Sequence, residues 1–187
     1  METRRALPAR IATVAAALAC ALGAAAPARA GWTGGPEMAV KATYLYKLAR
    51  FVDWPAGVYA GPTAALTICV QGLDPFGPVL DLAISGRTVG THPVVVRRLA
   101  KLEAGSGCQV AYLAGGPAQS SAQALQAVEG QPVLTVTDEA RGAPARGIVH
   151  LQRVAGRVRF SIDASQAEEN GVAISSKLLK LAVAVKR

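Results

Sequence analysis

The sequence predicts an α/β fold: a layered sandwich with a mainly parallel sheet flanked by helices, followed by a C-terminal antiparallel β-hairpin. Two observations carry this prediction. Short apolar runs rich in β-branched residues alternate with helical patterns up to residue 136, the order that a parallel sheet requires. After that point, two further strand-like runs are separated by Ala155 and Gly156, which is typical of a hairpin turn.

The first 30 residues have the three parts of an export signal. Three arginines lie within the first ten positions, residues 11–26 form an apolar run, and residues 28–30 read Ala-Arg-Ala, a cleavage pattern. The apolar run is shorter than the roughly 20 residues that a membrane-spanning helix needs. We therefore expect residues 1–30 to be removed and residues 31–187 to form one domain in the periplasm.

A competing interpretation concerns Cys20. The preceding Leu18 and Ala19 partly match a lipoprotein cleavage site, at which the cysteine would be lipidated. Because Ala17 stands where leucine is usual and the apolar run continues past Cys20, cleavage after Ala30 is favoured.

The elements of the expected domain begin at Pro36. A helix is predicted over residues 36–52, because apolar side chains recur there at steps of three and four. Trp54 and Pro55 end this helix, since proline cannot continue its hydrogen-bond ladder. Residues 66–70 are apolar and β-branched, and predict a buried strand.

The pattern continues with a helix and two strands. The helix is predicted over residues 75–84, with Asp74 as its N-cap and Pro75 in its first position. The strands are predicted over residues 93–98 and 108–113. This alternation is again typical of parallel strands joined by helices.

The second half of the chain predicts the far side of the sheet. A helix over residues 117–128 leads to a strand over residues 132–136, and an irregular link follows over residues 138–144. The strands of the hairpin are predicted over residues 148–151 and 157–162.

The C-terminal segment predicts two helices. Asp163 has the side chain of an N-cap for a short helix, and Gly171 ends that helix. A final helix is predicted over residues 174–185.

The charge of the chain argues against nucleic acid as a partner. The formal net charge is +8, but the basic residues are scattered and no run of five or six like charges occurs. A solvated basic surface accounts for this distribution, and the expected export from the cytoplasm leaves little opportunity to meet nucleic acid.

Two cysteines remain once the signal is removed, Cys69 and Cys108. In an oxidising compartment, two cysteines in one domain favour a disulfide, which would contribute roughly 4 kcal/mol in the chain-entropy model. Two buried free thiols are the alternative. His92 and His150 show no ligand spacing with either cysteine, so no metal site is expected.

The sequence contains no nucleophile elbow, no phosphate-binding loop and no zinc-protease motif, so neither catalysis nor a cofactor is expected. Asp138 follows a strand and is a candidate for a ligand cleft at the carboxyl ends of the strands. Asp74 and Phe76, in the turn after an earlier strand, could share that cleft, although a fixed strand-to-helix turn with Phe76 packed beneath it is the favoured explanation. His92 and His150 are interpreted as structural residues.

A second candidate site is a partner-binding surface. Tyr46, Arg50 and Trp54 are spaced by four residues, so they form a stripe beside the apolar face of the first helix. Tyrosine, arginine and tryptophan are enriched at binding hot spots, although packing within the monomer is the alternative. Lys177 and Lys180 in the final helix are the other candidate contacts.

The chain resembles the YfiR-like family of periplasmic proteins across nearly all of residues 31–187. The similar segments are residues 40–55, 68–70, 74–77, 86–87, 94–99, Cys108, 132–138, 156–160 and 174–179. The resemblance implies a non-enzymatic repressor that binds the periplasmic domain of an inner-membrane diguanylate cyclase and restrains cyclic-di-GMP synthesis and biofilm formation. We expect such a regulator to be a homodimer. Some members carry a second cysteine pair, which this chain lacks.

Two alternatives stay open at the level of sequence. The chain could be a periplasmic small-ligand-binding protein, with its cleft near Gly72, Leu73, Asp74 and Asp138. It could also be a hydrolytic enzyme that uses Asp138 or His92.

Overall fold

The computed structural model describes residues 35–142 and 145–187. The predicted export signal, residues 1–30, and the alternative lipidation site at Cys20 lie outside the described residues. Within the described ranges, no helix is long and apolar enough to cross a membrane.

An eight-stranded sheet forms the centre of the fold, with the strand order β10-β8-β7-β6-β5-β2-β4-β3. The strands are β2 (Leu66–Gly72), β3 (Thr88–Val89), β4 (His92–Leu99), β5 (Val110–Gly115), β6 (Leu134–Asp138), β7 (Val149–Val154), β8 (Arg157–Asp163) and β10 (Val185–Lys186). The adjacent strands β4, β2, β5, β6 and β7 are mutually parallel. Strands β7 and β8 form an antiparallel hairpin. The predicted fold class is confirmed.

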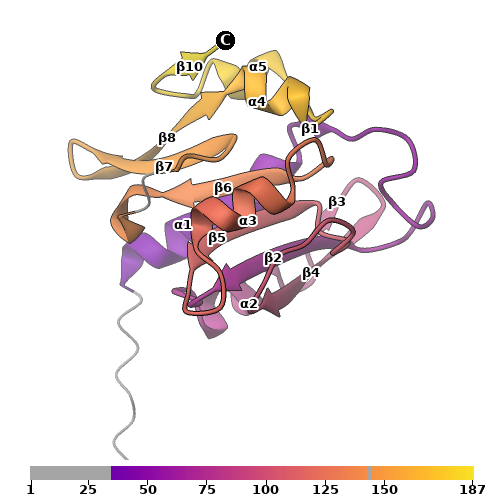
Figure 1. Ribbon diagram of the computed structural model, residues 1–187, viewed down its shortest axis with the longest axis horizontal. Helices are drawn as coiled ribbons and strands as arrows, with labels where there is room; N and C mark the ends of the chain where they lie inside the picture. The colour runs from indigo at the N-terminus through magenta and orange to yellow at the C-terminus, as the bar shows by residue number, and fades with distance from the viewer. Residues whose placement is uncertain (1–34, 143–144) are drawn as a thin grey trace, which may run out of the picture. The chain divides into compact units, whose positions relative to one another are not determined.

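Helices cover both faces of this sheet (Figure 1). They are α1 (Pro36–Ala49), α2 (Pro78–Ile84), α3 (Ser121–Ala127), α4 (Ala164–Glu169) and α5 (Ser176–Leu179), with a 3-10 turn η1 (Glu139–Arg141). Helices α1 and α2 pack against each other on one face, and α3 packs on the opposite face against β5. Each face therefore has its own apolar core.

The two cores follow the alternation of side chains along the strands. Toward α1 and α2 lies the larger core, which includes Leu45, Val70 and Tyr112. Toward α3 lies a smaller core, which includes Cys69 and Leu113. Neighbouring residues of one strand thus serve different cores, which is why the central strands are buried on both sides.

Two predicted helices begin or end elsewhere. Helix α1 ends at Ala49, because Val52 and Asp53 form the short strand β1 (Val52–Asp53), which pairs with β9 (Ala173–Ile174). Helix α2 begins at Pro78 and not at residue 75, since the Asp74 carboxylate accepts the Phe76 N–H within a tight turn at 2.7 Å.

The predicted helix over residues 117–128 begins later than expected, at Ser121. The Ser120 side chain accepts the Gln123 N–H, and the Gln123 side chain accepts the Ser120 N–H, which together form a capping box. The Ser-x-x-Gln spacing is visible in the sequence and marks this start.

The predicted final helix over residues 174–185 is wrong. Ile174 pairs with Val52 in the β1–β9 ladder, only four residues form α5, and Val185 pairs in parallel with Ile162 of β8. The Lys186 ammonium reinforces this last pairing by an ion pair of 2.8 Å with Asp163. Both ends of the segment pair with strands, with β1 at its start and β8 at its end, and these pairings override the local helix propensity.

Candidate functional site

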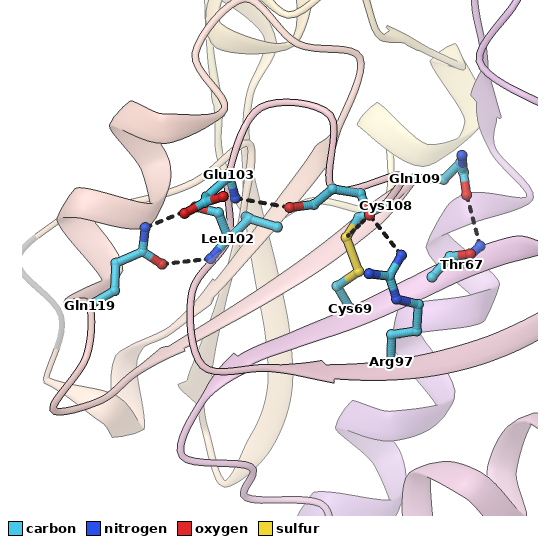
Figure 2. The surroundings of a disulfide bond; sticks show 9 residues. Thr67, Cys69, Arg97, Leu102, Glu103, Cys108, Gln109 and Gln119 are labelled. Atoms are coloured by element: carbon cyan, nitrogen blue, oxygen red, sulfur yellow. Dashed lines mark hydrogen bonds between the residues drawn. A yellow bond between two sulfur atoms is a disulfide. The ribbon is translucent and has the colours of Figure 1, made fainter.

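The disulfide between Cys69 and Cys108 joins β2 to the turn just before β5, as predicted (Figure 2). Their Cα atoms are 5.8 Å apart, and both side chains are buried in the core beneath α3. The Arg97 guanidinium donates to the Ser106 carbonyl at 2.7 Å beside this bond. The turn before Cys108 is therefore fixed by a covalent bond and a charged hydrogen bond.

The point at which the strand order reverses lies between β2 and β5. From β2 the chain passes through α2 to β4, and from β5 it passes through α3 to β6 on the other side. In open α/β sheets, the crevice at the carboxyl ends of these two strands is the usual ligand site. The small-ligand alternative depends on this crevice.

The protein's own backbone occupies the crevice. The Leu73 N–H donates to the Gly115 carbonyl at 2.9 Å, and a Cβ atom at Gly72 would overlap that carbonyl group. Glycine is required at position 72 for a second reason as well, because its φ of +84° lies in the left-handed region.

A buried amide fills the space beside these glycines. The Gln71 side chain accepts the Gly115 N–H at 3.2 Å and donates to the Gln119 carbonyl at 2.9 Å. Gln119 in turn accepts the Leu102 N–H at 2.8 Å and donates to the Leu102 carbonyl at 2.9 Å (Figure 2). These bonds tie together the loops that would otherwise open a binding crevice.

Asp138 belongs to a buried ion pair. Its Oδ2 atom lies 2.6 Å from Lys41 Nζ, and each of these two residues is only 1% exposed. Lys41 also lies 2.6 Å from Glu37, and the Tyr112 hydroxyl donates to Asp138 at 3.0 Å. Burial, followed by the charge of Asp138 and this hydrogen bond, raises the pKa of Tyr112 well above its usual range.

Asp138 has a second structural role at the end of β6. Its Oδ1 atom accepts the Ala140 N–H at 3.0 Å and so caps η1. A carboxylate with both oxygen atoms engaged joins the sheet to α1. Lys41 was not predicted as its partner, although a lysine on the apolar face of an amphipathic helix is a recognisable signal of a buried ion pair.

Asp74 and Phe76 are not brought into a common cavity with Asp138. Phe76 packs edge-on against Tyr112 in the core, with ring centroids 4.7 Å apart. Asp74 binds Arg98 at 2.7 Å on the surface. Arg98 also binds Asp81 at 2.6 Å, and this hydrogen bond holds the pKa of the Asp81 carboxyl below its usual range.

Both histidines have internal partners. His92 stacks on Tyr59, with ring centroids 3.7 Å apart, and its Nδ1 atom lies 2.6 Å from the Ala64 carbonyl oxygen. His150 Nδ1 lies 3.0 Å from the Thr137 hydroxyl, and burial lowers the pKa of His150. In residues 35–142 and 145–187, no group of three or more potential metal ligands is found.

One residue of the predicted partner surface, Tyr46, is buried in the structure. Tyr46 is only 8% exposed, with the Arg87 guanidinium 5.8 Å from the centre of its ring, so it does not belong to an exposed stripe. Arg50 is exposed, and Trp54 is half-buried with an indole N–H that has no partner among the described residues. The helical repeat placed Tyr46 beside Arg50, but Tyr46 belongs to the apolar core and the loop residue Arg87 lies over its ring.

The structure brings the remaining candidates together from the two ends of the chain. The β1–β9 ladder and a hydrogen bond of 2.9 Å from the Ser175 N–H to the Phe51 carbonyl place the end of α1 beside the start of α5. Lys177 and Lys180 are exposed there. We call the surface formed by Arg50, Trp54, Lys177 and Lys180 the α1–α5 surface.

Comparison with protein-family models gives a match over most of the described fold. The family model described as YfiR/HmsC-like matches residues 38–183, from the first turn of α1 to the segment before β10. A search of curated proteins finds no match. The matched range contains the disulfide, the buried ion pair and the whole α1–α5 surface.

Proposed function

Since the chain belongs to the YfiR/HmsC-like family, we propose that it is a periplasmic repressor that binds the external domain of an inner-membrane diguanylate cyclase. By this binding it restrains cyclic-di-GMP synthesis and biofilm formation, and it carries out no catalysis itself. The observation that carries the proposal is the family match over nearly the whole described fold.

The geometry of the strand ends supports a protein-binding role over a small-ligand role. The crevice between β2 and β5 is filled by Gln71 and by the contact of Gly72 with Gly115. Asp138 and His92, which the small-ligand and hydrolase alternatives would use, are held by internal partners. The chemistry available to a partner therefore lies on the outside of the domain.

The α1–α5 surface is the proposed contact region. It combines an exposed arginine, a half-buried tryptophan and two exposed lysines, and tryptophan and arginine are the side chains that most often dominate binding energy. Repression requires tighter binding to the inactive arrangement of the cyclase than to the active one, because equal affinity would shift nothing.

A homodimer is part of the proposal, because two-fold dimers are the commonest assemblies of soluble proteins. Sedimentation of the protein without its export signal over a range of concentrations tests this part separately.

The proposed function is tested by deleting the gene and measuring cyclic-di-GMP. The deletion should raise cyclic-di-GMP and biofilm mass, and the full chain should restore both. A version without residues 1–30 should fail to restore them, since it would stay in the cytoplasm. Unchanged cyclic-di-GMP in the deletion strain would refute the proposal.

The contact region is tested by charge reversal. Lys177→Glu with Lys180→Glu should weaken capture of the cyclase from detergent-solubilised membranes. Arg157→Glu with Arg159→Glu, on exposed positions of the hairpin, is the matched control. Equal capture by both variants would exclude the α1–α5 surface.

A further inference from the structure

The outer edge of β4 is open along most of its length. On one side, β4 pairs with β2 from Val94 to Leu99. On the other side, β3 pairs only with His92 and Pro93. The sheet therefore ends at β4 from about Val95 onward, within the described residues.

The backbone groups that face outward on this edge can be identified. The Val94 N–H donates to the Arg87 carbonyl on the β3 side at 3.0 Å. Backbone groups along a strand point alternately to its two neighbours, so the N–H and C=O groups of Val96 and Arg98 point to the same side as those of Val94. No strand pairs with them there in the described residues.

The side chains along this edge are basic. Arg97 and Lys101 are exposed, and neither lies within ion-pair distance of a carboxylate in the described part of the chain. Arg98 is neutralised by Asp74 and Asp81 on the α2 side of the sheet. The uncompensated positive charge thus lies on the disulfide side, next to Val95, which is 38% exposed.

This charge distribution favours an acidic partner segment over a second copy of β4. Two copies of β4 paired edge to edge would bring their own cationic side chains together, and like charges on paired strands are destabilising. The same side chains attract an extended segment with acidic residues at alternate positions, because alternate side chains of an added strand lie on one face.

We propose that β4 binds its protein partner by strand addition, taking an extended segment with alternating acidic and apolar side chains along residues Val95 to Leu99. This inference rests on the proposed function. It adds the β4 edge as a second contact region beside the α1–α5 surface and specifies the chemistry of the segment that the partner supplies there. The backbone of Val96 and Arg98 would provide the hydrogen bonds, and Arg97 and Lys101 would select the charge.

A direct test uses an acetylated hexapeptide of alternating glutamate and valine, with a lysine–valine peptide as control. Hydrogen exchange is followed by NMR on the domain without its export signal. In the free protein, the amides of Val96 and Arg98 should exchange faster than those of Val95 and Arg97, which bond to β2. The acidic peptide should slow exchange at Val96 and Arg98, and the basic peptide should not.

Protection of Val96 and Arg98 in the free protein would overturn the inference. An equal response to both peptides, or a response confined to other residues, would overturn it as well.

Charge reversal connects the edge to the cyclase. Arg97→Glu with Lys101→Glu should weaken capture of the cyclase roughly tenfold, since exposed ion pairs contribute modestly and both are lost. The hairpin variant Arg157→Glu with Arg159→Glu should capture it as the wild type does.

A second variant, Val96→Pro, removes an outward N–H without breaking the ladder to β2, and its fold is checked by its thermal transition. If the wild type captures the cyclase and both β4 variants do so equally well, the inference fails and the proposed function stands. If the wild type captures no cyclase, the proposed function fails and the inference fails with it.

Discussion

The two faces of the sheet are stabilised in different ways. On one face, the 14-residue helix α1 and the shorter α2 cover a large apolar core, within which Lys41 and Asp138 form a buried ion pair. On the other face, the seven-residue helix α3 covers a small core, within which Cys69 and Cys108 are joined covalently. A large apolar core stabilises the fold enough to tolerate the desolvation of a charge pair. A small core buries less apolar area, so a covalent cross-link contributes a larger share of its stability.

The largest expected effect is the loss of the buried lysine. Lys41→Met should lower the free energy of unfolding by roughly 3 to 5 kcal/mol, because it leaves the Asp138 carboxylate buried without its counter-charge. Urea unfolding monitored by circular dichroism measures the change. The comparison is sharpened by Lys47→Met, which removes an exposed lysine from the same helix and should cost far less.

A double variant distinguishes charge from shape at this position. Lys41→Met with Asp138→Asn should recover part of the loss, since the remaining group is neutral. Equal stabilities of Lys41→Met and Lys47→Met would contradict the role of the ion pair.

The next effect concerns the opposite face. Replacing both Cys69 and Cys108 by alanine should cost about 2 to 4 kcal/mol, because the unfolded chain regains the freedom of the closed loop. Chemical unfolding with and without reductant measures this difference. Reductant should bring the wild type to the stability of the double variant, and a wild type insensitive to complete reduction would disprove the stabilising role.

A smaller effect is expected at Gly72, in the crevice between β2 and β5. Gly72→Ala should destabilise by about 2 to 3 kcal/mol, since it adds overlap with Gly115 to an unfavourable backbone conformation. Gly130→Ala is the matched control, because Gly130 has a φ of +69° with open space around it and reports the backbone cost alone. Equal shifts in the thermal midpoint would show that the contact with Gly115 is not tight.

The smallest effect is a pH-dependent one on the α2 side. The hydrogen bond from Arg98 lowers the pKa of Asp81, so its contribution is present above the carboxyl's unfolded pKa and is lost as the pH falls through the lower folded value. Asp81→Asn should therefore cost less than 1 kcal/mol at pH 7, since the pair is largely exposed. The difference in thermal midpoint from the wild type should shrink below about pH 4. A difference that persists undiminished at pH 2 would point to packing and not to charge.

Local sequence patterns predicted some features of the candidate sites and not others. The cysteine count and the predicted export signal indicated the Cys69–Cys108 bond, because two cysteines in a domain expected to be oxidised have few alternatives. The same kind of reasoning placed Tyr46 on an exposed stripe, and it is buried. A helical repeat tells which side chains share a face, but it does not tell how far neighbouring elements extend over that face.

By itself, the sequence determined the fold class, the hairpin and the six longer strands β2 and β4 to β8, since these follow from the period of apolar side chains and from turn residues within a few positions of one another. Only the tertiary structure decided the pairing of Lys41 with Asp138, the filling of the crevice by Gln71, and the division of the last segment between β9, α5 and β10. These outcomes depend on groups distant in the chain that compete for the same hydrogen bonds and buried space, and no local pattern records that competition.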